Sequence, residues 1–315
     1  MVMPSWWNLS RLLQVLVGGL ALATVGGFFG VYAWWLDVLA DFRVQYALAA
    51  VVLFGACLAW RRKKEAVLAL ALLIPNGWTV YTNWGDADDV SGALKIVSYN
   101  IYFKNLDIAP AFDFLRRENA DVVVVTEATD VWRTAFKDLS DVYPHQFFGP
   151  LYKGVNDKPH RIGILAKRRW MKTGVEWSDA SARAYAIWVR FPAASPSLTV
   201  AGVHLLNPIL HPASFQKAEN EALATLVKRF DGPVVVAGDF NMTPFSTRFG
   251  RLLKEADLRR ATGGLNTTWP SLLTPLGLGL DHFLVSSKVK RAAMRVGPRL
   301  WSDHRPIVGT FDLER

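Results

Sequence analysis

The chain places acidic and amide side chains at the ends of short apolar segments. The clearest case is VVVAGDFN, residues 234–241, in which four small or β-branched residues precede Gly238, Asp239 and Asn241. The apolar residues predict a buried strand, and Gly238 allows the backbone to turn at its end. Because side chains two positions apart on an extended segment point the same way, we expect Asp239 and Asn241 to converge on one small volume.

Similar groups end or follow other predicted strands. In chain order the set is Asn100, Glu127, His204, Asp239, Asn241, Asp281, Asp303 and His304. Carboxylate and amide oxygens suit a hard divalent cation such as Mg²⁺, although a histidine and carboxylate site for Mn²⁺ is also compatible with these residue types. The two histidines of the set suit proton transfer or the stabilisation of a developing negative charge better than metal binding.

Each of these residues also has a purely structural interpretation. An Asp or Asn at a strand end is usually a turn or cap residue, and Glu127 could cap a following helix. His282 would face away from Asp281 along a strand, so we expect it to be structural. His145, His160 and His211 belong to no cluster in the sequence and are interpreted as surface or loop residues. The functional interpretation depends on several polar residues that end or follow predicted strands and occur together in a fixed order.

Period-two alternation and β-branched runs predict the strands that position these groups. They cover residues 94–102, 121–127, 162–166, 184–191, 198–204, 234–237 and 280–286. Amphipathic spacing predicts helices over residues 105–119, 213–230 and 248–258. Strand, helix and strand at the start, followed by shorter β-prone segments, indicate an α/β layer arrangement.

The first 84 residues predict a membrane anchor. The apolar stretch near 12–35 is long enough to cross a bilayer as a helix, and the stretches near 44–60 and 66–84 are predicted as a second and a third span. Tryptophans lie at the ends of these stretches. Lys and Arg prefer the cytoplasmic side of a membrane, so the basic cluster 61–64 is predicted to lie in the cytoplasm. Three spans would then place the rest of the chain outside the cytoplasm. If 66–84 only lies on the membrane, the domain is cytoplasmic. A cleaved signal peptide would explain the first span alone.

Residues 85–93 are short, polar and glycine-flanked, which predicts a linker into a second domain over 94–315. The first 90 residues carry equal numbers of basic and acidic groups, so the whole +9 formal charge lies on the remainder. This excess favours an anionic partner such as nucleic acid, phospholipid headgroups or a phosphorylated small molecule. A solvated basic surface without a specific partner explains the charge equally well.

Six segments carry a resemblance to a known family. They are SYNI around Asn100, VVVVTE ending at Glu127, GVHL with His204, AGDFN with Asp239 and Asn241, LDHFLVS with Asp281, and WSDHRPIV with Asp303 and His304. In this order they resemble the endonuclease/exonuclease/phosphatase family, which has the fold of DNase I and the AP endonucleases. The resemblance covers residues 95–311, and the anchor is similar to that of bacterial membrane-bound members.

The resemblance implies a two-sheet α/β sandwich that hydrolyses phosphate esters with Mg²⁺ or Mn²⁺. Glu127 would bind the metal, helped by Asn100 and Asp303 in the family pattern. His304, held by Asp281, would act as the base, or would stabilise the transition state if Asp239 is the base. The non-bridging phosphate oxygens would be bound by Asn241 and His204.

The resemblance does not identify the substrate, because this family acts on nucleic acids, lipids and small phosphorylated molecules. Basic residues 167–169 could follow a nucleic-acid backbone, and an anchor makes a phospholipid or lipid-linked phosphate reasonable. The expected location is the bacterial inner membrane with the catalytic domain outside the cytoplasm, and no protein partner is predicted. The alternative is a non-catalytic membrane-bound scaffold that uses the same fold.

Overall fold

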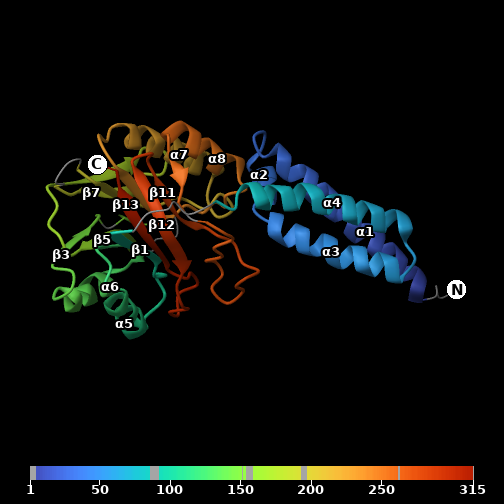
Figure 1. The fold of residues 1–315 in the computed structure, drawn as a ribbon, viewed down its shortest axis with the longest axis horizontal. Helices are drawn as coiled ribbons and strands as arrows, with labels where there is room; N and C mark the ends of the chain where they lie inside the picture. The colour runs from blue at the N-terminus through green and yellow to red at the C-terminus, as the bar shows by residue number, and fades with distance from the viewer. Residues whose placement is uncertain are drawn as a thin grey trace. The chain divides into compact units, whose positions relative to one another are not determined.

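The computed structural model describes residues 5–85, 92–150, 152–153, 159–192, 197–261 and 263–314. The chain divides into two compact units, one of Met1–Trp84 with Pro244–Gly250 and one of Gly85–Thr243 with Arg251–Arg315. Figure 1 labels their elements along the chain. Most of the predicted linker, residues 86–91, lies outside the described residues.

The first unit is helical. It contains α1 (Ser5–Gly26), η1 (Gly27–Phe29), α2 (Trp34–Ala40), α3 (Arg43–Ala59) and α4 (Lys63–Thr82). Many aliphatic and aromatic side chains of these helices are exposed, including Val15, Leu22 and Val52. Such an outer face is typical of helices that lie against lipid.

The prediction of three membrane spans is not supported. Among the described residues, Leu9–Phe29 is the one helix long and apolar enough to cross a bilayer, and α2 with α3 would add a second only if that pair, bent by 61°, is counted as one span. Helix α4 is not a candidate, because its first turn is charged and its second half carries Asn76, Thr79 and Thr82. The argument from an odd number of spans therefore no longer places the rest of the chain outside the cytoplasm.

Buried polar side chains join three of these helices. The Arg43 Nη1 atom donates to the carbonyl oxygen of Thr24 at 2.8 Å and to Asn76 Oδ1 at 3.2 Å, and Asn76 Nδ2 donates to Thr24 Oγ1 at 3.0 Å. Asn76 Nδ2 also donates to the carbonyl of Leu72 at 2.8 Å. This local bond lies beside Pro75, and α4 runs through that proline.

Within the same unit, Asp37 binds the segment Pro244–Gly250. Its carboxylate accepts hydrogen bonds from Ser246 Oγ at 2.7 Å and from the Thr247 backbone N–H at 2.7 Å, and Arg248 lies 3.3 Å away. A carboxylate at this position caps the first turn of α8 (Thr247–Ala256). The sequence did not indicate this role for Asp37.

The second unit is built on two sheets. The first has the order β12-β13-β1-β2-β5-β3, with β4 paired to β5, and the second has the order β10-β11-β9-β8-β7-β6. The strands of the first sheet are β1 (Leu94–Asn100), β2 (Val122–Ala128), β3 (His145–Phe148), β4 (Tyr152–Lys153), β5 (Pro159–Ala166), β12 (Val289–Val296) and β13 (Ile307–Leu313). Those of the second are β6 (Lys172–Ser178), β7 (Arg183–Arg190), β8 (Thr199–His204), β9 (Val234–Asp239), β10 (Arg259–Arg260) and β11 (Asp281–Val285).

Each sheet has one parallel pair at its centre. Strands β1 and β2 are parallel and are connected through α5 (Ile108–Glu118), while β8 and β9 are parallel and are connected through α7 (Ala213–Lys228). The neighbouring strands β13, β5, β7 and β11 pair antiparallel with these. The central strands are β-branched and buried on both faces, as expected for strands packed between layers.

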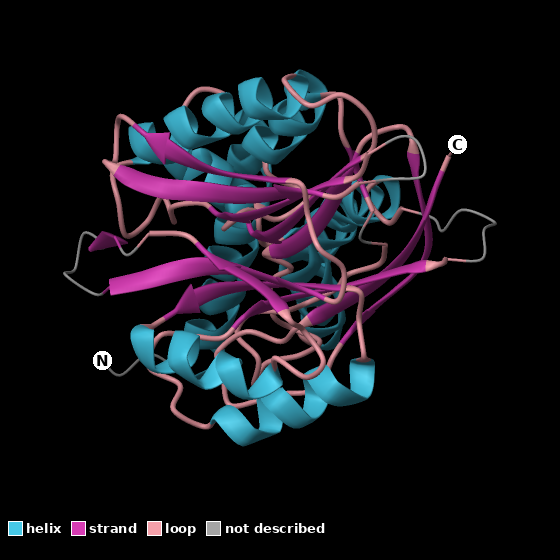
Figure 2. Ribbon diagram, turned by 90° about the vertical axis from the view of Figure 1, so that its left-hand side faces the viewer, coloured by secondary structure: helices cyan, strands magenta, loops and turns pink. Residues whose placement is uncertain are grey.

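The two sheets pack face to face around an apolar core, with helices outside (Figure 2). Residues such as Ile96, Val124, Ile187, Val235 and Phe283 fill the space between the sheets. The side chains of α5, α6 (Asp130–Ala135) and η2 (Phe136–Leu139) form a second core on the outer face of the first sheet. The predicted two-sheet α/β sandwich is therefore confirmed.

Candidate active site

The topology brings together the polar residues that were predicted at the ends of strands. Because β1 runs parallel to β2 and β8 parallel to β9, the carboxyl ends of each pair lie at one edge. Strand β11 begins there, with Asp281 directly opposite Asp239 in the antiparallel register. His304 lies just before β13, which pairs with β1. Residues as far apart in the sequence as Asn100 and His304 are thus placed around one volume.

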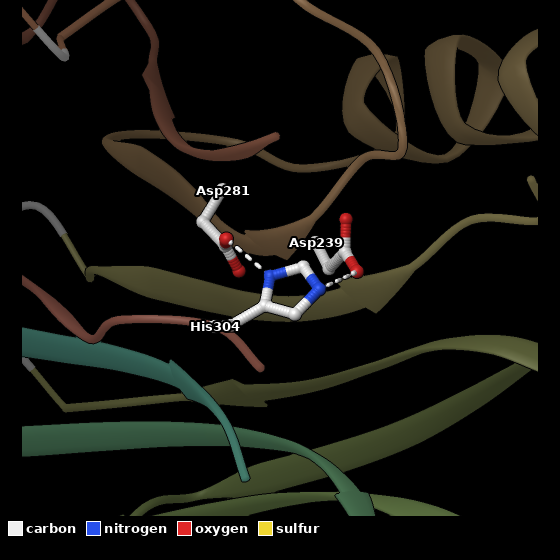
Figure 3. A group of neighbouring side chains, drawn as sticks. All are labelled: Asp239, Asp281 and His304. Atoms are coloured by element: carbon white, nitrogen blue, oxygen red, sulfur yellow. Dashed lines mark hydrogen bonds and ion pairs between the residues drawn. The ribbon is translucent and has the colours of Figure 1, made fainter. Parts of the chain in front are cut away.

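His304 lies between two buried carboxylates (Figure 3). Its Nδ1 atom is 2.8 Å from Asp281 Oδ2, and its Nε2 atom is 3.7 Å from Asp239 Oδ2. All three side chains are almost fully buried. The hydrogen bond to Asp281 fixes the ring so that the other nitrogen faces Asp239.

Asn100 joins the carboxylates of both sheets. Its Nδ2 group donates to Glu127 Oε1 at 3.1 Å and to Asp239 Oδ2 at 3.1 Å. Glu127 also accepts from the backbone N–H of Phe103 at 3.1 Å. Its φ is +61°, in the left-handed region, and the pairing of β2 with β5 shifts register at this point. The bulge directs Glu127 to the site at a cost in backbone strain.

His204 completes the edge of the site from the end of β8. Its Nε2 atom lies 3.8 Å from Glu127 Oε1 and 3.9 Å from Asp239 Oδ2. The close approach of β8 and β9 here requires glycine, because a Cβ at Gly238 would lie 1.9 Å from the carbonyl oxygen of Val203 and the Gly238 φ is +149°.

The structure differs from the expectation for Asn241. Strand β9 ends at Asp239, and Asn241 has a φ of +51°, so the alternation of an extended segment does not apply. The Asn241 N–H donates to Asp239 Oδ1 at 2.9 Å, and its Nδ2 donates to the carbonyl of Leu205 at 2.8 Å. The Asn241 side chain therefore ties the turn after β9 to the segment after β8.

Asp303 lies next to His304 on the connection into β13. Its Oδ2 atom accepts from Trp269 Nε1 at 3.3 Å, while its Oδ1 atom is buried without a hydrogen-bond partner. Asp281 Oδ1 is likewise buried and without a partner. Unpartnered carboxylate oxygens in an enclosed site fit a bound cation.

The carboxylates and histidines have shifted pKa values. Burial raises the pKa of Asp239, and His304 only partly offsets this. Burial alone would lower the pKa of His304, but Asp281 and Asp239 outweigh it and raise that pKa. Burial also raises the pKa of Glu127, whereas burial and then the charge of Arg183 lower the pKa of His204. The site thus favours an imidazolium at His304 and a neutral imidazole at His204.

Two groups of residues could hold a metal ion. One atom each from Asp239, Asp281 and His304 lies within 4.8 Å of the others. The residues predicted from the family resemblance are Glu127, Asn100 and Asp303, of which Glu127 and Asn100 are hydrogen-bonded. Both groups supply the oxygen ligands that Mg²⁺ and Mn²⁺ prefer.

Several residues that support the site were not singled out from the sequence. Ser302 Oγ donates to the carbonyl of Asn100 at 2.7 Å and accepts from the His304 N–H at 3.0 Å. Thr268 Oγ1 accepts from the backbone N–H of Asp281 at 3.4 Å. The His160 ring lies 5.7 Å from that of His204, although His160 was interpreted as a surface or loop residue. No local spacing signals these contacts, because strand pairing makes them.

Glu219 and Arg183 form a buried pair behind His204. Glu219 accepts from the Leu206 N–H at 2.9 Å and from Ser181 Oγ at 2.9 Å, and Arg183 Nε lies 3.7 Å from it. Arg183 also donates to the carbonyl oxygen of His204. The pair therefore holds the backbone on both sides of Leu205.

Residues 97–304 match the model of the Endonuclease/Exonuclease/phosphatase family, and the chain belongs to that family. Proteins of this superfamily are phosphoester hydrolases. Among curated proteins, UPF0294 protein VP2298 of Vibrio parahaemolyticus is 30% identical over 139 residues, which is 40% of this chain and 47% of that protein. The matched region thus spans about half of this relative.

Solved structures show the same fold at low identity. The 3′ phosphatase NExo from Neisseria, bound to a product DNA hairpin, has a TM-score of 0.55 at 19% identity and covers 70% of this chain and 100% of that chain. TDP2 from D. rerio, complexed with a single-strand DNA product, has a TM-score of 0.57 at 17% identity, with 70% and 98% covered. A family protein from Leptotrichia buccalis has a TM-score of 0.59 at 12% identity, with 70% and 100% covered.

Proposed function

We propose that this protein is a membrane-anchored, divalent-metal-dependent phosphoesterase that hydrolyses a phosphomonoester or phosphodiester by direct attack of water. The observation that carries the proposal is the buried arrangement of Asp239, His304 and Asp281, with Asn100 and Glu127 beside it. Buried acids and imidazoles of this kind are costly unless the site uses them.

Asp239 is the proposed base. Burial raises its pKa, which brings a carboxylate closer to the range in which it can take a proton from water at neutral pH. The attacking oxygen bonds to phosphorus as Asp239 accepts a proton of the water. The ester oxygen leaves with the electron pair of its bond to phosphorus and takes up a proton from solvent. Asn100 and Asn241 hold the Asp239 carboxylate in place through hydrogen bonds of 3.1 and 2.9 Å.

His304 is the proposed cation that stabilises the phosphoryl oxygens. Asp281 binds its Nδ1 atom and favours the protonated ring, so Nε2 presents a proton on the side of Asp239. Negative charge that develops on these oxygens is stabilised by a fixed donor in a buried site. His204 lies within 4 Å of the Glu127 and Asp239 carboxylates and is a second proposed phosphate ligand. The Asn241 amide is the third, because its NH2 group has a second N–H after the hydrogen bond to the carbonyl of Leu205.

Glu127, Asn100 and Asp303, with the unpartnered oxygen of Asp281, are the proposed residues for Mg²⁺ or Mn²⁺. A divalent cation would supply Lewis-acid stabilisation of negative charge on the phosphate. The anchor is proposed from the apolar helix Leu9–Phe29, and the bacterial inner membrane is the proposed location.

The test uses the full chain purified in detergent. Plasmid DNA, RNA, phospholipid and soluble phosphomonoesters and phosphodiesters are each incubated with Mg²⁺, Mn²⁺ or EDTA. His304→Ala and Asp239→Ala are compared with His145→Ala, a histidine on the far strand β3. We expect metal-dependent hydrolysis that both site variants lower by about a hundredfold or more, while His145→Ala retains it.

Two results would contradict the proposal. Hydrolysis that survives in both site variants would show a contaminating enzyme. A folded chain that binds metal but hydrolyses no ester would support the scaffold alternative.

A further inference from the structure

A loop beside the candidate active site presents an apolar tip to solvent. Residues 269–278 are closed by a backbone bridge between Trp269 and Leu278. Within this loop Leu272, Leu273 and Leu276 are 69%, 56% and 54% exposed. We call these three leucines the apolar tip. Three neighbouring exposed leucines on one loop differ from the single apolar residues that are scattered over most surfaces.

The loop is fixed to the active-site backbone on the N-terminal side of the apolar tip. The Ser271 N–H donates to the carbonyl of Asp303 at 2.7 Å, and Ser271 Oγ donates to the carbonyl of Ser302 at 2.7 Å. Arg305 Nε donates to the carbonyl of Ser271 at 3.1 Å. Trp269 reaches Asp303 itself through its Nε1 atom. The apolar tip therefore has a defined position next to Asp303 and His304.

The chemistry of the loop suits a lipid surface. No charged residue occurs between Arg260 and Asp281, so the loop offers no cation to a nucleic-acid backbone. Part of its backbone is satisfied internally, since Leu273 donates to Pro270, Leu276 to Leu273, and Trp269 and Leu278 to each other. These bonds lower the cost of inserting the loop into an apolar phase.

An interfacial pair lies on the neighbouring segment. Trp301 is 59% exposed, and the Arg299 guanidinium lies 5.1 Å from the centre of a Trp301 ring. Tryptophan and arginine are the residues that favour the headgroup level of a bilayer. The segment is fixed because Tyr99 Oη and Asn105 Nδ2 both donate to the carbonyl of Leu300.

We infer that the apolar tip and Trp301 dock on a phospholipid bilayer, so that the site acts on phosphoesters presented at the membrane surface. The substrate class rests on the proposed phosphoesterase function, whereas the docking itself does not. The leucines enter the acyl region, Trp301 and Arg299 lie among the headgroups, and the phosphate faces Asp239 and His304. The same chain carries a helix able to cross a membrane by length and composition.

The first experiment locates the apolar tip directly. In a Cys57→Ala background, which removes the one native cysteine, Leu273→Cys is labelled with an environment-sensitive fluorophore. The full chain is reconstituted in vesicles of phosphatidylcholine and phosphatidylglycerol with spin-labelled lipid. The matched control is Lys217→Cys, on the exposed face of α7, where the side chain is 64% exposed. We expect lipid to quench the label at 273 several-fold more than the label at 217.

Equal quenching at the two positions would overturn the inference. A blue-shifted label at 273 that spin-labelled lipid does not quench would also overturn it and would indicate a second copy of the chain. Protection of this label by single-stranded DNA, in place of quenching by vesicles, would indicate a nucleic-acid partner instead.

The second experiment tests the substrate class. The triple variant Leu272→Ser, Leu273→Ser, Leu276→Ser is compared with Val131→Ser, Met171→Ser, Trp177→Ser, which removes three exposed apolar side chains elsewhere. The ratio of turnover on lipid-embedded esters to turnover on a soluble ester should fall about tenfold in the apolar-tip variant, because less apolar area enters the bilayer. An unchanged ratio would contradict the substrate class.

The two proposals fail in different ways. Soluble-ester hydrolysis that depends on His304, without lipid quenching at position 273, would keep the phosphoesterase function and reject the docking. Lipid quenching that persists in His304→Ala, with no ester hydrolysed by the parent chain, would keep the docking and reject the phosphoesterase function.

Discussion

At the scale of single residues, Asp281 controls the charge of His304. Its Oδ2 atom is 2.8 Å from His304 Nδ1, and both groups are buried. Asp281→Asn keeps a side chain of the same shape but removes the charge that favours the imidazolium. We expect kcat on a soluble phosphoester to fall about a hundredfold with little change in KM, because a transition-state interaction is lost.

The control for this change is Asp141→Asn, at an ion-paired carboxylate that is 60% exposed on the surface. Steady-state kinetics of both variants and the parent chain are sufficient. A kcat for Asp281→Asn equal to that of Asp141→Asn would show that the charge of His304 does not assist the reaction.

His282 has a structural role that sets an acid limit on stability. Its Nε2 atom lies 2.9 Å from the carbonyl of Met242, and burial, followed by the charge of Arg260, lowers the pKa of His282 to about 3. Below its usual pKa of 6.5, the unfolded chain takes up a proton that the folded chain does not. The His282 contribution to stability is therefore fully present above about pH 6.5 and is lost as the pH falls toward 3.

We expect the free energy of unfolding to decrease by about 1.4 kcal/mol per pH unit in this window from His282 alone. His282→Gln retains a donor for Met242 but does not titrate, so its slope should be smaller by that amount. Denaturant unfolding of the full chain between pH 4 and pH 7 measures both slopes. Parallel slopes for the two chains would show that His282 is accessible to protons in the folded state.

The sequence predicts which polar residues come together better than it predicts their contacts. Asn100, Asp239 and Asp281 were recognised because each lies where an apolar strand begins or ends. The contact of the Asn241 amide was not predicted. Asn241 has a left-handed backbone conformation, which the two-residue period of a strand does not describe. Local patterns define where a strand ends but not the turn that follows.

At the scale of elements, the Arg183 and Glu219 pair connects α7 to the ends of β7 and β8. Both side chains are at most 4% exposed. Glu219→Gln leaves a buried guanidinium without its counter-charge, which typically costs about 3 kcal/mol of stability. Arg183→Met combined with Glu219→Gln should cost less than the sum of the single changes, because neither charge is then left alone.

Denaturant unfolding of the four chains gives the coupling free energy. The pair on the surface of α7, Lys217 and Glu221, provides the control cycle, since both side chains are about half exposed or more and should couple by less than about 0.5 kcal/mol. Additive effects at Arg183 and Glu219 would show that the two charges are solvated independently.

The elements themselves follow from the sequence where burial is uniform. The run 122–126 is β-branched throughout, and the amphipathic stretch 213–228 forms α7. What the sequence does not show is the register across chain-distant strands. Asp281 lies opposite Asp239 because β11 pairs antiparallel with β9, and this pairing follows from tertiary packing and not from local propensity.

At the scale of the whole molecule, the apolar helix Leu9–Phe29 is the proposed anchor. Leu16 and Leu22 are exposed on it. Replacing both by lysine should release the chain from membranes in a sodium carbonate wash, because each charge costs about 2.5–3.5 kcal/mol at the centre of a spanning helix. The control replaces Val131 and Trp177, which are exposed elsewhere, by lysine. Release of the parent chain by carbonate would reject the anchor.

The number of spans was overestimated because composition was assessed without helix boundaries. Residues 44–60 and 66–84 are apolar on average, but α3 is a 17-residue helix and α4 has a charged first turn. Their polar residues bind one another inside the first unit, as Arg43 and Asn76 do. Apolar composition predicts contact with lipid or with other helices, and the sequence alone does not distinguish them.

The two sheets meet at the site, because Asn100 and Glu127 come from the first sheet and Asp239 and His204 from the second. A metal ion bound by carboxylates of both sheets would hold the two sheets together. Because the ion binds only the folded chain, its binding would stabilise that chain against unfolding. Each tenfold rise in free Mg²⁺ above its dissociation constant should add about 1.4 kcal/mol to the stability. The melting temperature of the full chain should therefore rise with Mg²⁺, and Glu127→Gln should weaken this response.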